Sequence, residues 1–481
     1  MKKLLILIIL FSAIGASAQY SLKFKVNGLK DTTIFLARYL GDKLYYADTA
    51  EAKNGIVEFK NQYDEGVYTL ICPGPKWFEV ILADKEIEME TSISNFITNM
   101  KVKKSANNKI FYDYIKFINQ KKNEAKDKNQ DKELMGRLDK EVKAYQNKLV
   151  AENKDLLVGK LINMSIDPII PEAIMKNDTL RYQYYKEHYW DNIDLSDKRL
   201  VHYPAFKNKL EFFFEKMLLQ QADTICSNAH TLIEQIENGS EMFKYVVHFI
   251  TYKYETSKIM GMDAVFYCMA DSYYCPPDKS RAYWLDPDKL KELCERKDAV
   301  GPLRVGQPAP RIILADTTEE KWVDFYTQVK TEHTALIFWA DDCGHCKKEM
   351  PKLKKLYAEL KEKNIDIEFV AVGTSLENKG WKKFIKENNL PWINISDFPD
   401  ANENPMKYLN QLRVTDLQSL NFRKTYDIFS TPQIYLLDRN KVIRAKKLDA
   451  KNLAKILEHK LSIDLDYEEP EEEEKKKEDT H

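Results

Sequence analysis

Two cysteines, two residues apart, stand where an apolar run ends and a helical pattern begins. In "TALIFWADDCGHCKKEMP" the run from Thr334 to Ala340 is typical of a buried strand, and an amphipathic helix is expected from Cys346 to about Glu362. The pair Cys343 and Cys346 therefore lies in a strand-to-helix turn. Such a pair can hold a metal, attach a haem, form a structural bridge or exchange disulfides with other proteins.

The neighbouring residues exclude two of these chemistries. A structural zinc site usually needs a second such pair or two suitably spaced histidines. The chain has no second C-x-x-C, and His345 lies between the two cysteines. A c-type haem needs a histidine directly after the second cysteine, where this chain has Lys347. A structural bridge stays open, but the location at the start of a helix argues against it.

A helix N-terminus favours redox chemistry at Cys343. Its unpaired N–H groups and the helix dipole stabilise a thiolate, and a thiolate is the nucleophile in disulfide exchange. Cys346, three residues on, is placed to resolve the mixed disulfide. His345 adds a donor, and a positive charge when protonated, which stabilises the reduced form and makes the pair more oxidising.

The part of the chain before this pair changes its pattern once. From 19 to 105, short alternating segments such as "SLKFKV" and "GVYTLIC", separated by turn residues, predict a small antiparallel β-sandwich. From 106 to 300, apolar residues recur at steps of three and four, which predicts an all-helical domain. This spacing is clearest at Leu134, Leu138, Val142, Tyr145 and Leu149.

The last third alternates strands with helices. Over 301–462 this alternation predicts an α/β fold with a largely parallel sheet. "TPQIYLLD" and "KVIRAKK" are expected to form its final strand pair. The charged segment 463–481 is expected to be a disordered tail.

The first eighteen residues predict export. Lys2 and Lys3 precede an apolar stretch from Leu4 to Ile14, and "ASA" supplies a cleavage site after Ala18. We expect a chain that works outside the cytoplasm, with no transmembrane segment after cleavage. A formal net charge of −1 argues against binding to nucleic acid or to an anionic membrane.

The other cysteines are scattered, and an exported protein can keep disulfides. A local bridge between Cys268 and Cys275 is conceivable, but free buried cysteines are the default expectation. The sequence leaves open how Cys72, Cys226, Cys268, Cys275 and Cys294 pair. No metal-ligand spacing is found at His188, His202 or His248, so no metal and no cofactor are expected.

"FWADDCGHCKKEMP" is similar to the active-site segment of the exported TlpA/ResA-like thiol-disulfide oxidoreductases, which belong to the thioredoxin superfamily. "VGQPAP" resembles the lead-in to their first strand, Glu349 matches their acidic residue after the second cysteine, and "STPQIYLLD" places Pro432 at their cis-proline. The resemblance covers about residues 301–462 and implies a thioredoxin fold with a redox-active disulfide.

The resemblance also implies a role for each matched residue. Cys343 attacks, Cys346 resolves, and Glu349 handles protons, unless it is an ordinary exposed helix acid. Pro432 in cis faces the cysteines, and the backbone of Thr431 pairs with an extended peptide. Trp339 and His345 are expected to shape the substrate groove, whereas Phe338 is expected in the core.

The resemblance leaves the direction of electron flow open. The family commonly has a proline or an acid between its cysteines, whereas Gly344 and His345 stand there, as in protein disulfide isomerases. We expect a periplasmic reductase of cysteine-containing exported proteins, served by an electron donor or acceptor of the membrane or periplasm. An oxidase or isomerase is the alternative. A peroxiredoxin is disfavoured because "ADDC" lacks the Thr-x-x-Cys context.

The domains before residue 301 resemble, more loosely, modules found ahead of thioredoxin domains in exported proteins of Gram-negative bacteria. This implies an architecture and no activity, so no catalytic residue is expected there. A second hypothesis is that these domains bind a partner and that the redox domain is secondary.

Overall fold

The computed structural model describes residues 20–41, 43–74, 76–126 and 131–465. The chain forms two compact units. The first unit holds the residues up to Leu219 together with Glu234–Tyr245, and the second holds Gln220–Ile233 together with the residues from Val246 onward. The predicted signal peptide and most of the predicted charged tail lie outside the described residues.

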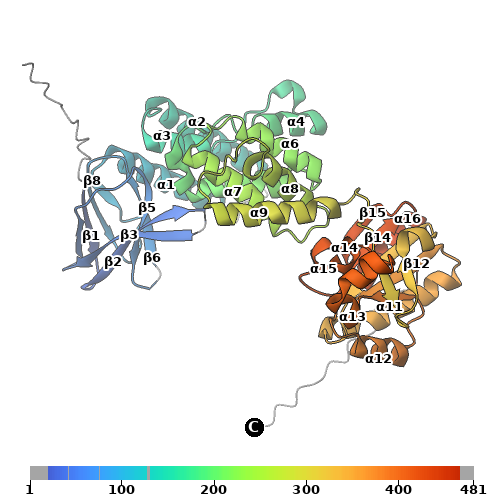
Figure 1. Ribbon diagram of the computed structural model, residues 1–481. Helices are drawn as coiled ribbons and strands as arrows, with labels where there is room; N and C mark the ends of the chain where they lie inside the picture. The colour runs from blue at the N-terminus through green and yellow to red at the C-terminus, as the bar shows by residue number, and fades with distance from the viewer. Residues whose placement is uncertain (1–19, 42, 75, 127–130, 466–481) are drawn as a thin grey trace, which may run out of the picture. The chain divides into compact units, whose positions relative to one another are not determined.

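Eight strands of the first unit form two four-stranded sheets with the orders β4-β1-β7-β8 and β3-β2-β5-β6 (Figure 1). In β1 the predicted alternation holds, because Leu22, Phe24 and Val26 are buried while their neighbours are exposed. The rings of Phe24 and Phe78, one from each sheet, lie 6.0 Å apart. The strands are Ser21–Asn27 (β1), Thr32–Leu40 (β2), Lys43–Ala52 (β3), Ile56–Phe59 (β4), Gly66–Cys72 (β5), Lys76–Leu82 (β6), Glu86–Ser92 (β7) and Lys101–Lys104 (β8).

The antiparallel arrangement expected for these strands is wrong at one pair. β1 and β7 run parallel in the middle of their sheet. Parallel neighbours need a long crossover connection, and here β2 to β6 lie between them in the sequence. Strand periodicity does not reveal the partner of a strand, so this pairing could not be predicted from the alternation of residues.

Helices follow in the first unit, and Asn108 joins the first of them to a sheet. Ser105 caps α1 by accepting a hydrogen bond from the backbone N–H of Asn108. The fully buried amide of Asn108 accepts from the N–H of Ile81 and donates to its carbonyl, both at 2.8 Å. The elements are Ala106–Ala125 (α1), Lys132–Glu152 (α2), Leu157–Met164 (α3), Glu172–Ile174 (η1), Asp178–Glu187 (α4), Lys198–His202 (η2), Pro204–Glu211 (α5) and Phe212–Met217 (η3).

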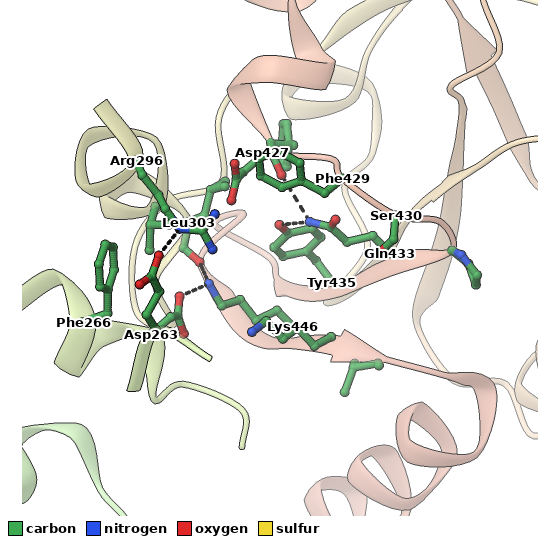
Figure 2. Close-up of a pocket in the computed structure, with 16 residues that line it drawn as sticks. Asp263, Phe266, Arg296, Leu303, Asp427, Phe429, Ser430, Gln433, Tyr435 and Lys446 are labelled. Carbon is green, nitrogen blue, oxygen red and sulfur yellow. Dashed lines mark hydrogen bonds and ion pairs between the residues drawn. The ribbon is translucent and has the colours of Figure 1, made fainter. Parts of the chain in front are cut away.

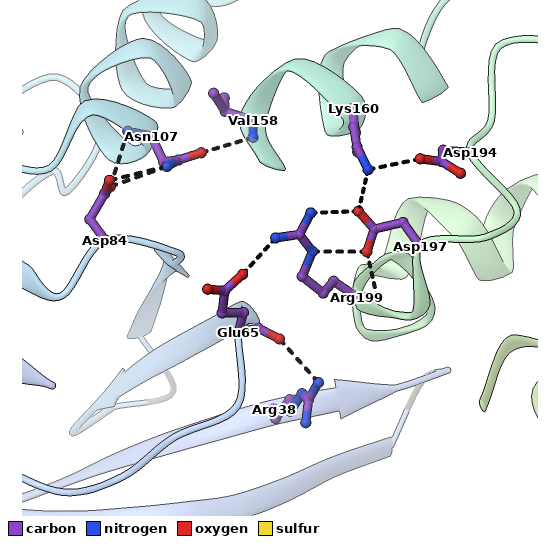
Figure 3. A network of polar contacts seen from close by, with 9 residues as sticks. All are labelled: Arg38, Glu65, Asp84, Asn107, Val158, Lys160, Asp194, Asp197 and Arg199. Carbon is purple, nitrogen blue, oxygen red and sulfur yellow. Dashed lines mark hydrogen bonds and ion pairs between the residues drawn. The ribbon is translucent and has the colours of Figure 1, made fainter. Parts of the chain in front are cut away.

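An ion network centred on Asp197 connects helices of the first unit to the loop before β5 (Figure 3). Arg199 binds the Asp197 carboxylate through two nitrogens, at 2.8 and 2.6 Å, and reaches Glu65 at 2.6 Å. Lys160 bridges Asp197 and Asp194, both at 2.8 Å. Burial alone would raise the pKa of Asp197, but the hydrogen bonds from Arg199 and Lys160 outweigh it and hold this pKa at about 2.

We expect Asp197→Asn to destabilise the first unit at pH 7 by about 1–3 kcal/mol, because it leaves two partly buried cations without their shared anion. The pKa of Asp197 is lowered in the folded state, so its contribution is present above the unfolded pKa of about 3.9 and is lost as the pH falls towards about 2. Chemical denaturation of the full chain between pH 2 and pH 7 measures this difference.

The matched control is Asp113→Asn. It removes an ion pair with Lys109 in which both side chains are at least half exposed. We expect this variant to lower the free energy of unfolding by less than about 1 kcal/mol. Equal losses for the two variants would contradict the account.

The second unit begins with helices that carry two disulfides. Cys226 is bonded to Cys268, and Cys275 to Cys294. The local bridge between Cys268 and Cys275, which the sequence left open, does not form, because the helix that carries Cys268 packs on α6 while η4, which precedes Cys275, packs on α9. The default expectation of free buried cysteines is confirmed only for Cys72 in this group. The elements are Ala222–Ile233 (α6), Asp263–Met269 (α8), Ala270–Tyr274 (η4), Pro287–Val300 (α9) and Gly301–Leu303 (η5), and Glu241–Glu255 (α7) belongs partly to each unit.

A seven-stranded sheet with the order β10-β9-β13-β12-β11-β14-β15 forms the centre of the C-terminal region. Only the pairs β11–β12 and β12–β13 are parallel, so the largely parallel sheet expected from the sequence is wrong and the sheet is mixed. The final pair, β14–β15, is the predicted one and is antiparallel because a short turn joins its strands. The strands are Ile313–Asp316 (β9), Trp322–Asp324 (β10), His333–Trp339 (β11), Ile367–Gly373 (β12), Ile393–Ser396 (β13), Gln433–Asp438 (β14) and Ile443–Leu448 (β15).

Helices cover both faces of this sheet, which explains why β11 is buried along its whole length. Ala335, Ile337 and Trp339 pack with residues of α11 and α16 in one core, and Leu336 and Phe338 pack in the core on the other face. The helices are Phe325–Gln328 (α10), Gly344–Glu362 (α11), Asn378–Asn388 (α12), Pro399–Glu403 (α13), Lys407–Gln411 (η6), Leu417–Leu420 (α14), Phe422–Thr425 (α15) and Ala450–Leu461 (α16). Among the described residues, no helix is both long and apolar enough to cross a membrane.

Candidate active site

Cys343 occupies the capping position of α11, directly after the loop that follows β11. Its sulfur accepts a hydrogen bond from the backbone N–H of Cys346 at 3.3 Å. Both cysteines are free thiols, but their exposure differs. Cys343 is half-buried, whereas Cys346 is 0% exposed. One thiol can therefore meet another molecule while the other lies beneath it.

The loop before β14 brings a second element to this pair. The Cys343 thiol donates a hydrogen bond to the carbonyl oxygen of Thr431 at 3.2 Å, across 88 residues of sequence. The peptide bond between Thr431 and Pro432 is cis, which agrees with the expectation from the resemblance. β14 pairs directly with β11, so the sheet itself holds the loop beside the cysteines.

The two thiols differ in acidity. Partial burial raises the pKa of Cys343, but hydrogen bonds with Cys346, including the one from its backbone N–H, outweigh it and place this pKa below the ordinary value. Burial raises the pKa of Cys346, and the hydrogen bond with Cys343 raises it further. A thiolate therefore forms first at Cys343, the more exposed of the two.

We expect the reduced protein to be alkylated at Cys343 with a pH midpoint below about 8.5, the ordinary value for cysteine. Cys346 should stay unmodified through that range because it is buried and its pKa is raised. Iodoacetamide labelling of the full chain at a series of pH values, read by peptide mass spectrometry, measures both residues. Cys72, whose pKa burial raises to about 11, is an internal control. Identical profiles for Cys343 and Cys346 would contradict the assignment.

Polar contacts fix the loop that carries Cys343. The Asp341 carboxylate accepts a hydrogen bond from the Ser375 hydroxyl at 2.6 Å. It also lies against the first turn of α12, where a Cβ on Gly380 would stand 2.0 Å from a carboxylate oxygen. Only glycine permits this approach, so α12 and the cysteine loop are packed tightly against each other.

A buried ion pair supports this arrangement from below. Arg423 donates to the carbonyl oxygens of Thr374 and Ser375 at 2.9 and 3.4 Å. It binds the Asp397 carboxylate through two nitrogens, at 2.6 and 2.8 Å, and Asp397 is 0% exposed. Neither residue was predicted from the sequence, because they lie 26 positions apart. The sign that the sequence offered of this ion pair was an acid and an arginine at the two ends of the segment 397–423.

Arg423→Met should lower the free energy of unfolding by about 2–4 kcal/mol, since it leaves a buried carboxylate without its counter-charge. Arg444→Met is the matched control, because Arg444 pairs with Asp438 through a side chain that is half exposed. We expect this variant to lower the free energy of unfolding by less than about 1 kcal/mol. Urea denaturation of the full chain measures both variants. A loss at Arg423 no larger than at Arg444 would show that the pair does not hold the loop.

The other predicted site residues lie in different surroundings. Glu349, whose side chain is 13% exposed, accepts a hydrogen bond from the backbone N–H of Ala450 at 2.5 Å at the start of α16. Its role in proton handling stays a prediction. His345 is exposed beside the pair. Trp339 differs from the prediction: its ring is fully buried in the core with Cys346 and 5.2 Å from Phe384, so it supports the site from beneath and presents no surface.

A pocket of about 420 Å³ lies next to the cis-proline (Figure 2). Pro432 and Gln433 contribute to one wall, and Phe429, 80% exposed, stands beside them. The buried ammonium of Lys446 forms the opposite side, where it is paired with the Asp263 carboxylate and donates to the carbonyl of Leu303 at 2.6 Å. Helices α8 and α9 thus share this pocket with the sheet, which the sequence did not indicate.

Comparison with protein families gives matches for three consecutive segments. Residues 304–459 match the family described as Redoxin. Residues 119–297 match a domain of unknown function (DUF5106), and residues 20–111 match a second one (DUF4369).

The relatives and solved structures each cover part of the chain. The thiol-disulfide oxidoreductase ResA of Bacillus thuringiensis is 27% identical over 146 residues, which are 30% of this chain and 70% of the relative. A solved domain of a possible thiol-disulfide isomerase from Cytophaga hutchinsonii is 33% identical and covers 34% of this chain and 95% of its own, with a TM-score of 0.27. A solved thioredoxin-like protein from Bacteroides caccae is 17% identical. The match covers 61% of this chain and 97% of that protein's chain, with a TM-score of 0.44.

Proposed function

We propose that this chain, which belongs to the TlpA/ResA-like thiol-disulfide oxidoreductases of the thioredoxin superfamily, exchanges disulfides with exported proteins through Cys343 and Cys346. The observation that carries the proposal is the asymmetry of the pair. The half-buried Cys343 has a lowered pKa and touches the cis-proline loop, while Cys346 is buried with a raised pKa.

The asymmetry supports a two-step reduction. The Cys343 thiolate attacks a substrate disulfide, one sulfur–sulfur bond replaces another, and the first substrate sulfur leaves and takes a proton. Cys346 then loses its proton and attacks the Cys343 sulfur, which releases the second substrate thiol. The substrate gains two electrons, and the protein ends with a bond between Cys343 and Cys346.

Glu349 is our candidate for the proton of Cys346. It lies three residues further along α11, and its side chain is largely shielded from solvent. One carboxylate oxygen accepts from the N–H of Ala450, and the other lies 4.0 Å from the Lys352 ammonium; this second oxygen is the acceptor we propose.

The loop at Thr431 and Pro432 is the proposed contact surface for the substrate backbone. Extended peptides pair with exposed backbone groups by β-augmentation, and the carbonyl of Thr431 already accepts a hydrogen bond from the attacking thiol. The exposed ring of Phe429 and the adjacent pocket would receive side chains of the bound segment. His345, exposed beside the pair, would face the same segment.

We place the protein in the periplasm as a reductase that takes electrons from a membrane or periplasmic donor. The location rests on the signal-peptide pattern of residues 1–18, and the direction is the one expected from the resemblance of the active-site segment to the TlpA/ResA-like family. His345 favours the alternative of an oxidase or isomerase. The reduction potential of the full chain decides between the two directions. A value of about −270 mV supports a reductase, and a value of about −180 mV would overturn the proposal of a reductase.

Reduction of insulin by the full chain with dithiothreitol tests the activity itself. Cys343→Ser should slow the reaction to the rate of dithiothreitol alone, because the attacking sulfur is missing. Cys72→Ser is the control, since this cysteine is a buried thiol of the first unit and should not affect the rate. An unchanged rate in Cys343→Ser, with the fold intact by circular dichroism, would refute the proposed function. If the activity resides elsewhere, the front domains become the candidate functional part.

A further inference from the structure

A second group of sulfur and nitrogen donors lies in the helical part of the second unit. Cys226 and His230 are four residues apart on α6 and so share one face of that helix. Cys268 reaches them from α8. One donor atom from each residue lies within 4.8 Å of the other two, and each residue is partly exposed. His230 was not predicted as a site residue, because Cys268, which completes the group with Cys226, lies 38 positions away in the sequence.

Tyr273 orients the imidazole of this group. The Nδ1 atom of His230 lies 2.8 Å from the Tyr273 hydroxyl, and its Nε2 atom lies 3.2 Å from the Cys268 sulfur. When Nδ1 carries the proton and donates it to the hydroxyl, the lone pair of Nε2 points at the sulfur. Metal-binding histidines show this arrangement, in which a second contact fixes the tautomer and direction of the ring.

We propose that Cys226, His230 and Cys268 form a binding site for one thiophilic divalent cation, with Zn²⁺ as the best fit, when the two sulfurs are reduced. Two thiolates and one imidazole are ligands that Zn²⁺ prefers, whereas Mg²⁺ and Ca²⁺ prefer oxygen ligands. The partial exposure of the three residues gives the ion an entry path and leaves a fourth position for water. The proposal does not depend on the function proposed above.

The disulfide and the metal site are two alternative states of the same sulfurs. In the structure Cys226 and Cys268 are bonded to each other. A dithiol reductant gives two electrons to this bond and becomes a disulfide itself, and the two sulfurs take up two protons. The cation then displaces these protons as it forms two metal–sulfur bonds. Oxidation of the sulfurs releases the ion, so binding reports the redox state of the compartment.

The second disulfide provides a matched control within the same unit. Cys275 and Cys294 are also bonded, but within the described residues no third donor joins them to form such a group. Two cysteines that lack a histidine are expected to bind the ion much more weakly.

The test uses the full chain carrying Cys343→Ser and Cys346→Ser, so that the other thiol pair is absent. The protein is reduced with a phosphine, titrated without oxygen with Co²⁺ as a coloured substitute, and then with Zn²⁺. We expect one equivalent of Co²⁺ with sulfur-to-metal charge-transfer absorption, displacement by Zn²⁺, and no binding by the oxidised protein. Added Zn²⁺ should protect Cys226 and Cys268 from iodoacetamide but leave Cys275 and Cys294 reactive.

His230→Gln should weaken binding at least about tenfold, while Cys275→Ser should leave it unchanged. The alkylation pattern needs no variant in the group itself, so it gives an answer even if a substitution impairs folding. Failure of the reduced protein to bind Co²⁺ or Zn²⁺ would overturn the proposal. So would protection that falls equally on all four cysteines.

Discussion

The hydrogen bond between the Cys343 thiol and the carbonyl of Thr431 connects the two elements on which the site depends. One is the start of α11, where the backbone N–H of Cys346 donates to the sulfur. The other is the loop that carries the cis-proline. Each is held by a neighbouring strand, β11 or β14, and these strands pair with each other. The contact is therefore a property of the sheet. The opposite shifts of the two pKa values have other causes: hydrogen bonds with Cys346 lower the pKa of Cys343, and burial raises that of Cys346.

Buried arginine–aspartate pairs hold irregular segments in both units. Arg423 with Asp397 supports the loops under the cysteines, and Arg199 with Asp197 supports the junction between helices and a sheet turn. In each case the guanidinium binds the carboxylate with two nitrogens and uses a third contact to reach another segment. Such a fork fixes direction as well as distance, which a lysine could not do. In the second unit, Lys446 and Asp263 instead join a strand to a helix as a point-charge pair.

The patterns that could be read from the sequence are those that act locally. The alternation in β1, the buried run of β11 and the cysteine spacing each depend on residues close together in the chain, so the strands, the helix start and the redox pair were predictable. The parallel pairing of β1 with β7, the mixed sheet and both disulfides depend on contacts between distant segments. Arg423 and Asp397 belong to this second class. Trp339 shows a further limit, because a tryptophan beside a reactive cysteine reads equally well as a groove or as a core residue, and the structure places it in the core.

The most direct test of the account is to capture the reaction between its two steps. A full chain carrying Cys346→Ser keeps the exposed, more acidic thiol and lacks the resolving one. When it is exposed to exported proteins of a Gram-negative cell and analysed by mass spectrometry, mixed disulfides should accumulate on Cys343, whereas Cys343→Ser should yield none because Cys346 is buried. Mixed disulfides on Cys346 in the second variant, or none on Cys343 in the first, would contradict the assignment of the attacking sulfur.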